Sequence, residues 1–166
     1  MEEIAVRHIF VINPTAGKGN WVARLKECIR EETEKAGVNA EIYAELGQKK
    51  MEEHVRQLAQ SGQALRIYAC GGDGTIFSVV NASYGCRNVQ IAAIPFGSGN
   101  DFIRLFGAKE ELQEIARHIH GTPLWIDAIE CAGEVAINQC SMGLDAEVCA
   151  KQISFKKIPW MSGEFA

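Results

Sequence analysis

Three glycine-rich segments carry the residues of this sequence that are best suited to bind phosphate. They are NPTAGKG at residues 13–19, GGDGT at residues 71–75 and PFGSGNDF at residues 95–102. Glycines let backbone N–H groups approach an anion closely, and Lys18 would add a positive charge. Asp73 and Asp101 supply carboxylates that could hold a divalent metal ion directly or through water. These residue types predict a site for a phosphorylated ligand.

The first segment departs from the common phosphate-binding motifs. A Walker A loop would need glycine at position 12 and serine or threonine at position 19, where the sequence has Ile12 and Gly19. The segment does not follow G-x-G-x-x-G either. Taken alone it is equally compatible with a simple turn before a helix.

The other two segments are more specific. Residues 71–75 directly follow an apolar run and precede a helical pattern, and a helix N-terminus offers free N–H groups and the positive end of a dipole. Asp73 could instead be a helix cap supported by Thr75, and Asn100 or Asp101 could cap a short helix. A cap would not require three flanking glycines, so the ligand interpretation is favoured. Two such loops at neighbouring strand ends would surround a polyphosphate.

Apolar runs and helical spacings alternate along the first part of the chain. Strands are predicted at 6–12, 40–44, 65–70 and 90–95, and helices lie between them. Gly37 and Gly62 are expected to end the first two helices. This order predicts an α/β fold with a mostly parallel sheet and helices on both faces. Ligands bind such sheets at the carboxyl ends of the strands, where the three glycine-rich segments fall.

The pattern changes after a helix predicted at 110–120. Short segments at 124–130, 134–138 and 144–150 have no clear helices between them, and glycines and a proline punctuate them. We therefore predict a nucleotide-binding α/β domain at 1–123 and the first segments of an incomplete β-rich second domain at 124–166. The final KKIPWMSGEFA is interpreted as an interruption of that domain.

Composition excludes several classes of protein. The 166 residues are 47% hydrophobic and 23% charged with a net charge of -4, which is typical of a soluble globular protein and argues against nucleic-acid binding. The acidic N-terminus is unlike a signal peptide, and no apolar run approaches the ~20 residues that span a bilayer. A cytoplasmic protein is predicted, with contact at a membrane surface left open. The six cysteines lack metal-ligand spacing and are expected to be reduced, mostly buried thiols.

Together the three segments resemble the diacylglycerol kinase catalytic domain, a family that also includes sphingosine, ceramide and bacterial lipid kinases. GGDGT is shared with NAD kinases, whereas the other two segments are more specific to the lipid kinases. The resemblance extends to Ile126-Asp127 and to INQCSMGLDAEV at residues 137–148, which look like the first strands of the family's second domain.

The resemblance implies ATP and Mg²⁺ as cofactors and the hydroxyl of a lipid such as diacylglycerol as the acceptor. It implies metal-linked roles for Asp73 and Asp101, and Ser98 stands at a position where the family has threonine. Contact with a membrane surface and a homo-oligomer are both compatible with it. The nucleotide-binding residues it implies are Asn13, Pro14, Thr15, Ala16, Gly17, Lys18, Gly71, Gly72, Asp73, Gly74, Thr75, Gly97, Ser98 and Asn100.

Three departures from the family pattern bear on activity. Phe77 and Ser78 stand where the family has Asn-Glu, and Glu45 stands where a nucleotide-contacting threonine is usual. The family's general base lies in a D-G-E-like segment, which we expect beyond residue 166, so no catalytic base is assigned and this chain alone is not expected to turn over lipid. An NAD kinase-like enzyme, a non-catalytic nucleotide-binding fragment and an α/β domain for another phosphate ligand are the alternatives.

Overall fold

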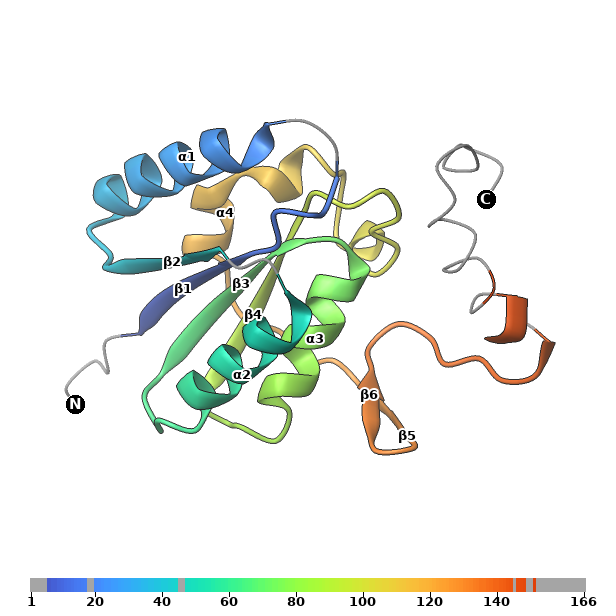
Figure 1. Ribbon diagram of the computed structural model, residues 1–166. Coiled ribbons are helices and arrows are strands. Elements are labelled where there is room, and N and C mark those ends of the chain that lie inside the picture. Colours follow the sequence, from blue (N-terminus) through green and yellow to red (C-terminus); the bar gives the residue numbers. More distant parts are fainter. Residues whose placement is uncertain (1–5, 18–19, 45–46, 145, 149–150, 152–166) are drawn as a thin grey trace.

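A four-stranded parallel sheet forms the centre of the molecule (Figure 1). The computed structural model describes residues 6–17, 20–44, 47–144, 146–148 and 151. The strand order is β2-β1-β3-β4, and all three neighbouring pairs run parallel. The strands are β1 (Arg7–Ile12), β2 (Ala40–Ala44), β3 (Leu65–Gly71) and β4 (Val89–Pro95).

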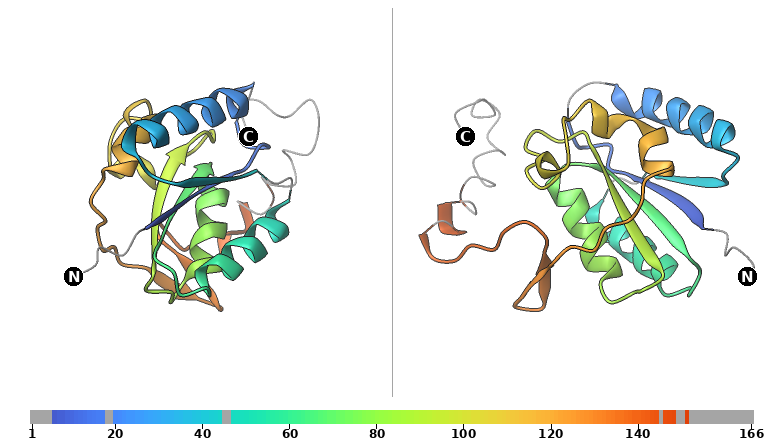
Figure 2. Two further views of the ribbon diagram at one scale, coloured as in Figure 1. Left: turned by 90° about the vertical axis from the view of Figure 1, so that its left-hand side faces the viewer. Right: turned by 180° about the vertical axis from the view of Figure 1, so that it is seen from behind.

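Helices cover both faces of this sheet, as the sequence predicts. The first and fourth helices lie on one face and the second and third on the other (Figures 1 and 2). Two short 3-10 helices, η1 and η2, follow β4. The bounds are α1 (Trp21–Ala36), α2 (Gln48–Ala59), α3 (Asp73–Ser83), η1 (Ile103–Leu105), η2 (Glu111–Gln113) and α4 (Ile115–Ile119).

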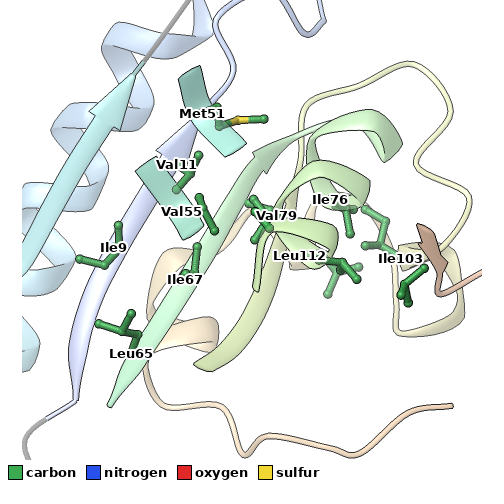
Figure 3. Close-up of a cluster of buried hydrophobic side chains, with 14 residues drawn as sticks. Ile9, Val11, Met51, Val55, Leu65, Ile67, Ile76, Val79, Ile103 and Leu112 are labelled. Atoms are coloured by element: carbon green, nitrogen blue, oxygen red, sulfur yellow. The ribbon is translucent and has the colours of Figure 1, made fainter. Parts of the chain in front are cut away.

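Each central strand divides its side chains between two hydrophobic cores, because successive residues of a strand point to opposite faces. On β1, Ile9 and Val11 pack with α2 and α3, whereas Phe10 and Ile12 pack with α1 and α4. Figure 3 shows the first of these cores. Burial on both faces explains why the strands read as continuous apolar runs. The fold class predicted from the sequence is confirmed.

The predicted helix at 110–120 is wrong as a single element. Glu114 is extended, with a ψ of 108°, and separates η2 from α4. The break has a packing cause: Leu112 is buried in the core beneath α2 and α3, whereas Ile115 and Ile119 are buried beneath α1. One continuous helix could not present these side chains to two opposite faces of the sheet.

After α4 the chain forms a two-stranded antiparallel hairpin of β5 (Ile129–Cys131) and β6 (Glu134–Ala136). Ala132 and Gly133 connect the strands with φ values of 52° and 82°, which a tight hairpin turn requires. The expected strand-like segment at 144–150 is helical at Leu144 and 146–148, so that expectation is wrong over its described residues.

Two composition-based expectations can be compared with the structure. Of the cysteines that the structure describes, Cys70 is buried, Cys28 and Cys86 are half-buried, and Cys131 and Cys140 are exposed, so the prediction of mostly buried thiols is wrong. All five are free. No helix within the described ranges is long and apolar enough to cross a membrane.

Candidate functional site

The three glycine-rich segments follow β1, β3 and β4, which are adjacent and parallel, so they meet at one edge of the sheet. We call them the β1 loop (residues 13–17), the β3 loop (residues 71–75) and the β4 loop (residues 96–101). The structure brings the predicted site residues together at this edge, with the exception of Lys18, which lies outside the described residues.

Asn13 joins the β1 loop to the β3 loop. Its backbone N–H donates to the Cys70 carbonyl at 3.0 Å, and its side-chain Nδ2 donates to the Thr75 hydroxyl at 3.2 Å. Its Oδ1 accepts both the N–H of Thr15 at 3.1 Å and the Thr15 hydroxyl at 2.7 Å. Because Thr75 is only 2% exposed, its side chain serves the contact between loops, and the ligand role predicted for it stays a prediction.

The β1 loop also packs against the β4 loop. The rings of Trp21 and Phe96 stack with centroids 4.0 Å apart, and the Trp21 indole N–H donates to the Ala16 carbonyl at 2.8 Å. Gly17 has a φ of +67°, and a Cβ at this position would lie 2.3 Å from the Phe96 carbonyl oxygen. Gly17 is therefore required by the contact between the two loops.

The β3 and β4 loops approach each other through their glycines. The N–H groups of Phe96 and Gly97 both donate to the Gly71 carbonyl, at 2.7 and 3.1 Å. A Cβ on Gly97 would lie 2.5 Å from the Cα of Gly72, a separation that real Cβ atoms do not adopt. From the sequence we expect these glycines to allow a ligand to approach the backbone closely. In the structure, the group that approaches each glycine is the backbone of the neighbouring loop.

Asp73 and Asn100 lock the β4 loop in place. Asp73 is the first residue of α3, and its Oδ2 accepts the backbone N–H of Asn100 at 2.7 Å. Asn100 is 4% exposed with a φ of 58°, and its side-chain amide bonds both the N–H and the carbonyl of Gly97, at 3.1 and 2.6 Å. Neither side chain caps a helix, so the alternative cap interpretation of both residues is wrong.

Two carboxylates face one pocket beside these loops. The pocket has a volume of about 320 Å³ and is lined by Asp73, Phe77, Asp101, Phe102 and residues 136–139, among others; we call it the α3 pocket. A Cβ on Gly99 would be 2.8 Å from Asp73 Oδ2 and 3.8 Å from Asp101 Oδ2, so the two carboxylates flank the same small space. Two oxygen donors suit a Mg²⁺ ion, which keeps much of its water. The described residues contain no group of three or more acidic, histidine or cysteine side chains that could enclose a metal.

Three residues of the β4 loop, Ser98, Gly99 and Asn100, border a second cavity of about 360 Å³. Ser98 is exposed and lines it together with two cationic side chains, Arg104 and Lys109. Arg104 also forms an ion pair with Asp101 at 3.1 Å. Below the loops, burial raises the pKa of the Cys70 thiol well above its usual range, so Cys70 remains a neutral thiol and is unsuited to nucleophilic chemistry.

The departures from the family pattern have structural consequences. Phe77 lines the α3 pocket, and Ser78 is fully buried with its hydroxyl donating to Glu52 Oε1 at 2.8 Å. Glu52 belongs to α2, so a carboxylate from another helix reaches the turn of α3 where the family has glutamate. Sequence reasoning missed Glu52 because nothing in its local pattern marks it. Glu45 lies outside the described residues.

Comparison with known proteins agrees with this architecture. The family model described as the diacylglycerol kinase catalytic domain matches residues 7–131, well over half of the chain. The chain belongs to this family. The matched residues include all three glycine-rich loops and both carboxylates of the α3 pocket, so the resemblance drawn from the sequence is confirmed.

Relatives of this diacylglycerol kinase-family chain are named as lipid kinases. YtlR from Bacillus subtilis (strain 168) is 28% identical over 88% of this chain and 50% of its own length. A YegS-like protein from Shewanella frigidimarina (strain NCIMB 400) is 32% identical over 52% of this chain and 29% of its own length. The chain therefore spans half the length of YtlR.

A solved structure supports the fold. A crystal structure named as a diacylglycerol kinase from Bacillus anthracis str. Sterne aligns with a TM-score of 0.64 at 24% identity, over 90% of this chain and 53% of that one. The likeness establishes a diacylglycerol kinase-like fold for this family member.

Proposed function

We propose that this chain supplies the ATP- and Mg²⁺-binding part of a kinase that phosphorylates the hydroxyl of a lipid such as diacylglycerol. The observation that carries the proposal is the mutual locking of the three glycine-rich loops at one sheet edge, with the carboxylates of Asp73 and Asp101 facing one pocket at the start of α3. Family membership and the names of the relatives support the same reaction.

Phosphoryl transfer depends mainly on positioning and charge stabilisation, and these loops supply both. The first turn of α3 presents backbone N–H groups and the positive end of a helix dipole to an anion. The hydrogen bonds of Asn13, Asp73 and Asn100 hold the loop backbones rigid, so little reorganisation accompanies binding. In this proposal the nucleotide phosphates lie along the three glycine-rich loops.

Asp73 and Asp101 would hold Mg²⁺ in this assignment, and the ion would neutralise phosphate charge. Asp73 then has two tasks, because one of its oxygens already accepts the Asn100 N–H. Lys18 would add a further cation. We assign no general base within this chain, and we place it in the remainder of a longer protein, in keeping with the span of half of YtlR.

The domain division belongs to the same proposal. Residues 1–123 would form the nucleotide-binding domain, and residues 124–166 would begin a second domain that walls the lipid side of the site. The exposed side chains of Leu124 and Trp125, 75% and 96% accessible, support this division because such apolar surface favours a further packing partner.

A direct test measures binding and transfer separately. Isothermal calorimetry with ATP and Mg²⁺ on this chain tests nucleotide binding, and radiolabelled ATP with the intact gene product tests diacylglycerol against NAD as acceptor. Labelled phosphatidic acid supports the proposal. Label in NADP instead would favour the NAD kinase alternative, and absence of ATP binding by the folded chain would refute the site.

A further inference from the structure

The side chain of Asn81 joins α3 to the hairpin that follows the α/β domain. Its Nδ2 donates to the Val135 carbonyl at 2.9 Å, and the Val135 N–H donates back to its Oδ1 at 2.8 Å. An amide side chain here pairs with the backbone of β6 in the way that a neighbouring strand would. Figure 1 shows β6 beside α3.

The same amide also reaches the wall of the α3 pocket. Nδ2 donates a second bond, at 2.9 Å, to the carbonyl of Phe77, one turn earlier on α3. Phe77 lines the α3 pocket, and so do residues 136–139, which follow Val135 directly. One NH₂ group therefore connects both walls of the pocket, although Asn81 itself does not line it.

Within the described residues, few other contacts join this part of the chain to the domain. Residues 121–134 are exposed throughout, whereas Val135 is 4% exposed and packs into the core beneath α2 and α3. Ile137 packs against the same core. The location of residues 136–139 relative to Asp73 thus depends on the contacts of Val135 and Ile137 and on the bonds of Asn81.

We infer that Asn81 is a positioning residue, which holds residues 136–139 across the α3 pocket from Asp73 and Asp101 and so governs the acceptor side of the reaction. This inference rests on the proposed function. Asn81 lies eight residues after Asp73, about 12 Å along the helix, so it sets the far wall without touching the nucleotide loops. Its loss affects the acceptor and spares ATP.

Two substitutions separate the two bonds to Val135. Asn81→Asp keeps an oxygen for the Val135 N–H but sets a second oxygen against the carbonyls of Phe77 and Val135, and Asn81→Leu removes all three bonds. Asn88→Asp is a matched control, because Asn88 Nδ2 also donates to two backbone carbonyls, those of Ala59 and Gln63, at 3.0 and 2.8 Å, far from the pocket.

The first measurement is hydrogen exchange of residues 134–139 in this chain. Each net hydrogen bond contributes on the order of 1 kcal/mol, so loss of the bonds to Val135 accelerates exchange there by roughly tenfold or more. Asn81→Leu shows this acceleration in full, and Asn81→Asp, which keeps an acceptor for the Val135 N–H, shows a smaller one. Both variants retain wild-type affinity for ATP and Mg²⁺, and Asn88→Asp shows no acceleration. Unchanged exchange in Asn81→Leu would overturn the inference.

The second measurement uses the intact gene product with dispersed short-chain diacylglycerol. The Asn81 variants raise KM for the lipid or lower kcat by roughly tenfold, on the same reasoning, and leave KM for ATP unchanged. Equal changes in both KM values, or the same loss in Asn88→Asp, would show a merely structural role. A wild-type protein that transfers no phosphate to lipid would refute the proposed function. In that case the hydrogen-exchange measurement still decides whether Asn81 positions residues 136–139.

Discussion

Gly97→Ala tests most directly whether the β3 and β4 loops are held in contact. The new methyl group would lie 2.5 Å from the Cα of Gly72 and 2.9 Å from the Oδ1 of Asn100, so it would displace backbone and disturb a buried amide. The reciprocal change, Gly72→Ala, brings its methyl to 3.1 Å from the Cα of Gly97, which a shift of a few tenths of an ångström relieves. Gly74→Ala is the control, because nothing lies within 4 Å of its added methyl.

The expected free energies follow from these distances. Gly97→Ala combines overpacking, typically 1–3 kcal/mol, with weakened hydrogen bonds of Asn100, and should destabilise the chain by roughly 2–4 kcal/mol. Gly72→Ala should cost about 1 kcal/mol. Gly74 lies in the first turn of α3, where alanine should stabilise by up to about 1 kcal/mol. Each kcal/mol corresponds to about 2–4 °C in Tm for a chain of this size.

Thermal unfolding followed by circular dichroism, with calorimetry of ATP and Mg²⁺ on each folded variant, measures both consequences. We expect Tm to rank Gly74→Ala, then wild type, then Gly72→Ala, then Gly97→Ala, and ATP affinity to fall at least tenfold for Gly97→Ala. If the Tm of Gly97→Ala equals that of Gly74→Ala, the β3 and β4 loops are not in contact. If it melts low but binds ATP normally, the contact is structural and the β4 loop is not part of the nucleotide site.

Three further predictions concern individual side chains. Asp73→Asn and Asp73→Ala should both weaken Mg²⁺-dependent ATP binding at least tenfold in calorimetry. Only the alanine variant, which lacks an acceptor for the Asn100 N–H, should also lose about 1–2 kcal/mol of unfolding free energy in urea. Wild-type affinity in Asp73→Asn would contradict the metal assignment. Asn100→Ala removes both hydrogen bonds to Gly97 and places an alanine at a φ of 58°, where it has no polar side chain to compensate. Urea unfolding should therefore show a loss of roughly 2–4 kcal/mol of unfolding free energy. An unchanged unfolding free energy would show that the buried Asn100 side chain does not stabilise the β4 loop. Burial, and secondarily the charge of Arg66, lower the pKa of His8 below 6.5. The unfolded chain therefore binds more protons than the folded chain, and stability should fall as pH drops below 6.5. A urea midpoint that falls as much in His8→Gln as in wild type between pH 7 and pH 5.5 would contradict this.

Local patterns in the sequence were sufficient for the four strands of the parallel sheet and the three helices between them. Continuous apolar runs and 3.6-residue spacing report burial of a strand or a helix face, and both depend on neighbours within a few residues. The strands therefore agree with the structure to within one residue, and Gly37 ends α1 in the left-handed conformation as expected. The carboxyl-end rule for parallel sheets then placed the three loops at one edge.

The same local patterns could not resolve how Glu110–His120 divides. Its apolar residues fit one helix by spacing, but Leu112 and Ile115 are buried on opposite faces of the sheet, and only the packed sheet decides which face each side chain reaches. Glu114 becomes extended for that reason. Tertiary packing overrides a weak helical pattern whenever the two halves of a segment have different partners.

The parallel α/β fold, the family and the three glycine-rich loops follow from the sequence, because residue type and short-range spacing carry that information. The contacts of those residues follow only from tertiary packing. Gly72 meets Gly97, and Asp73 holds Asn100 27 residues away; Asn81 holds Val135 across 54 residues. Such pairs depend on strand order and register, which bring distant backbone groups within hydrogen-bond distance, and no pattern within a single segment encodes them.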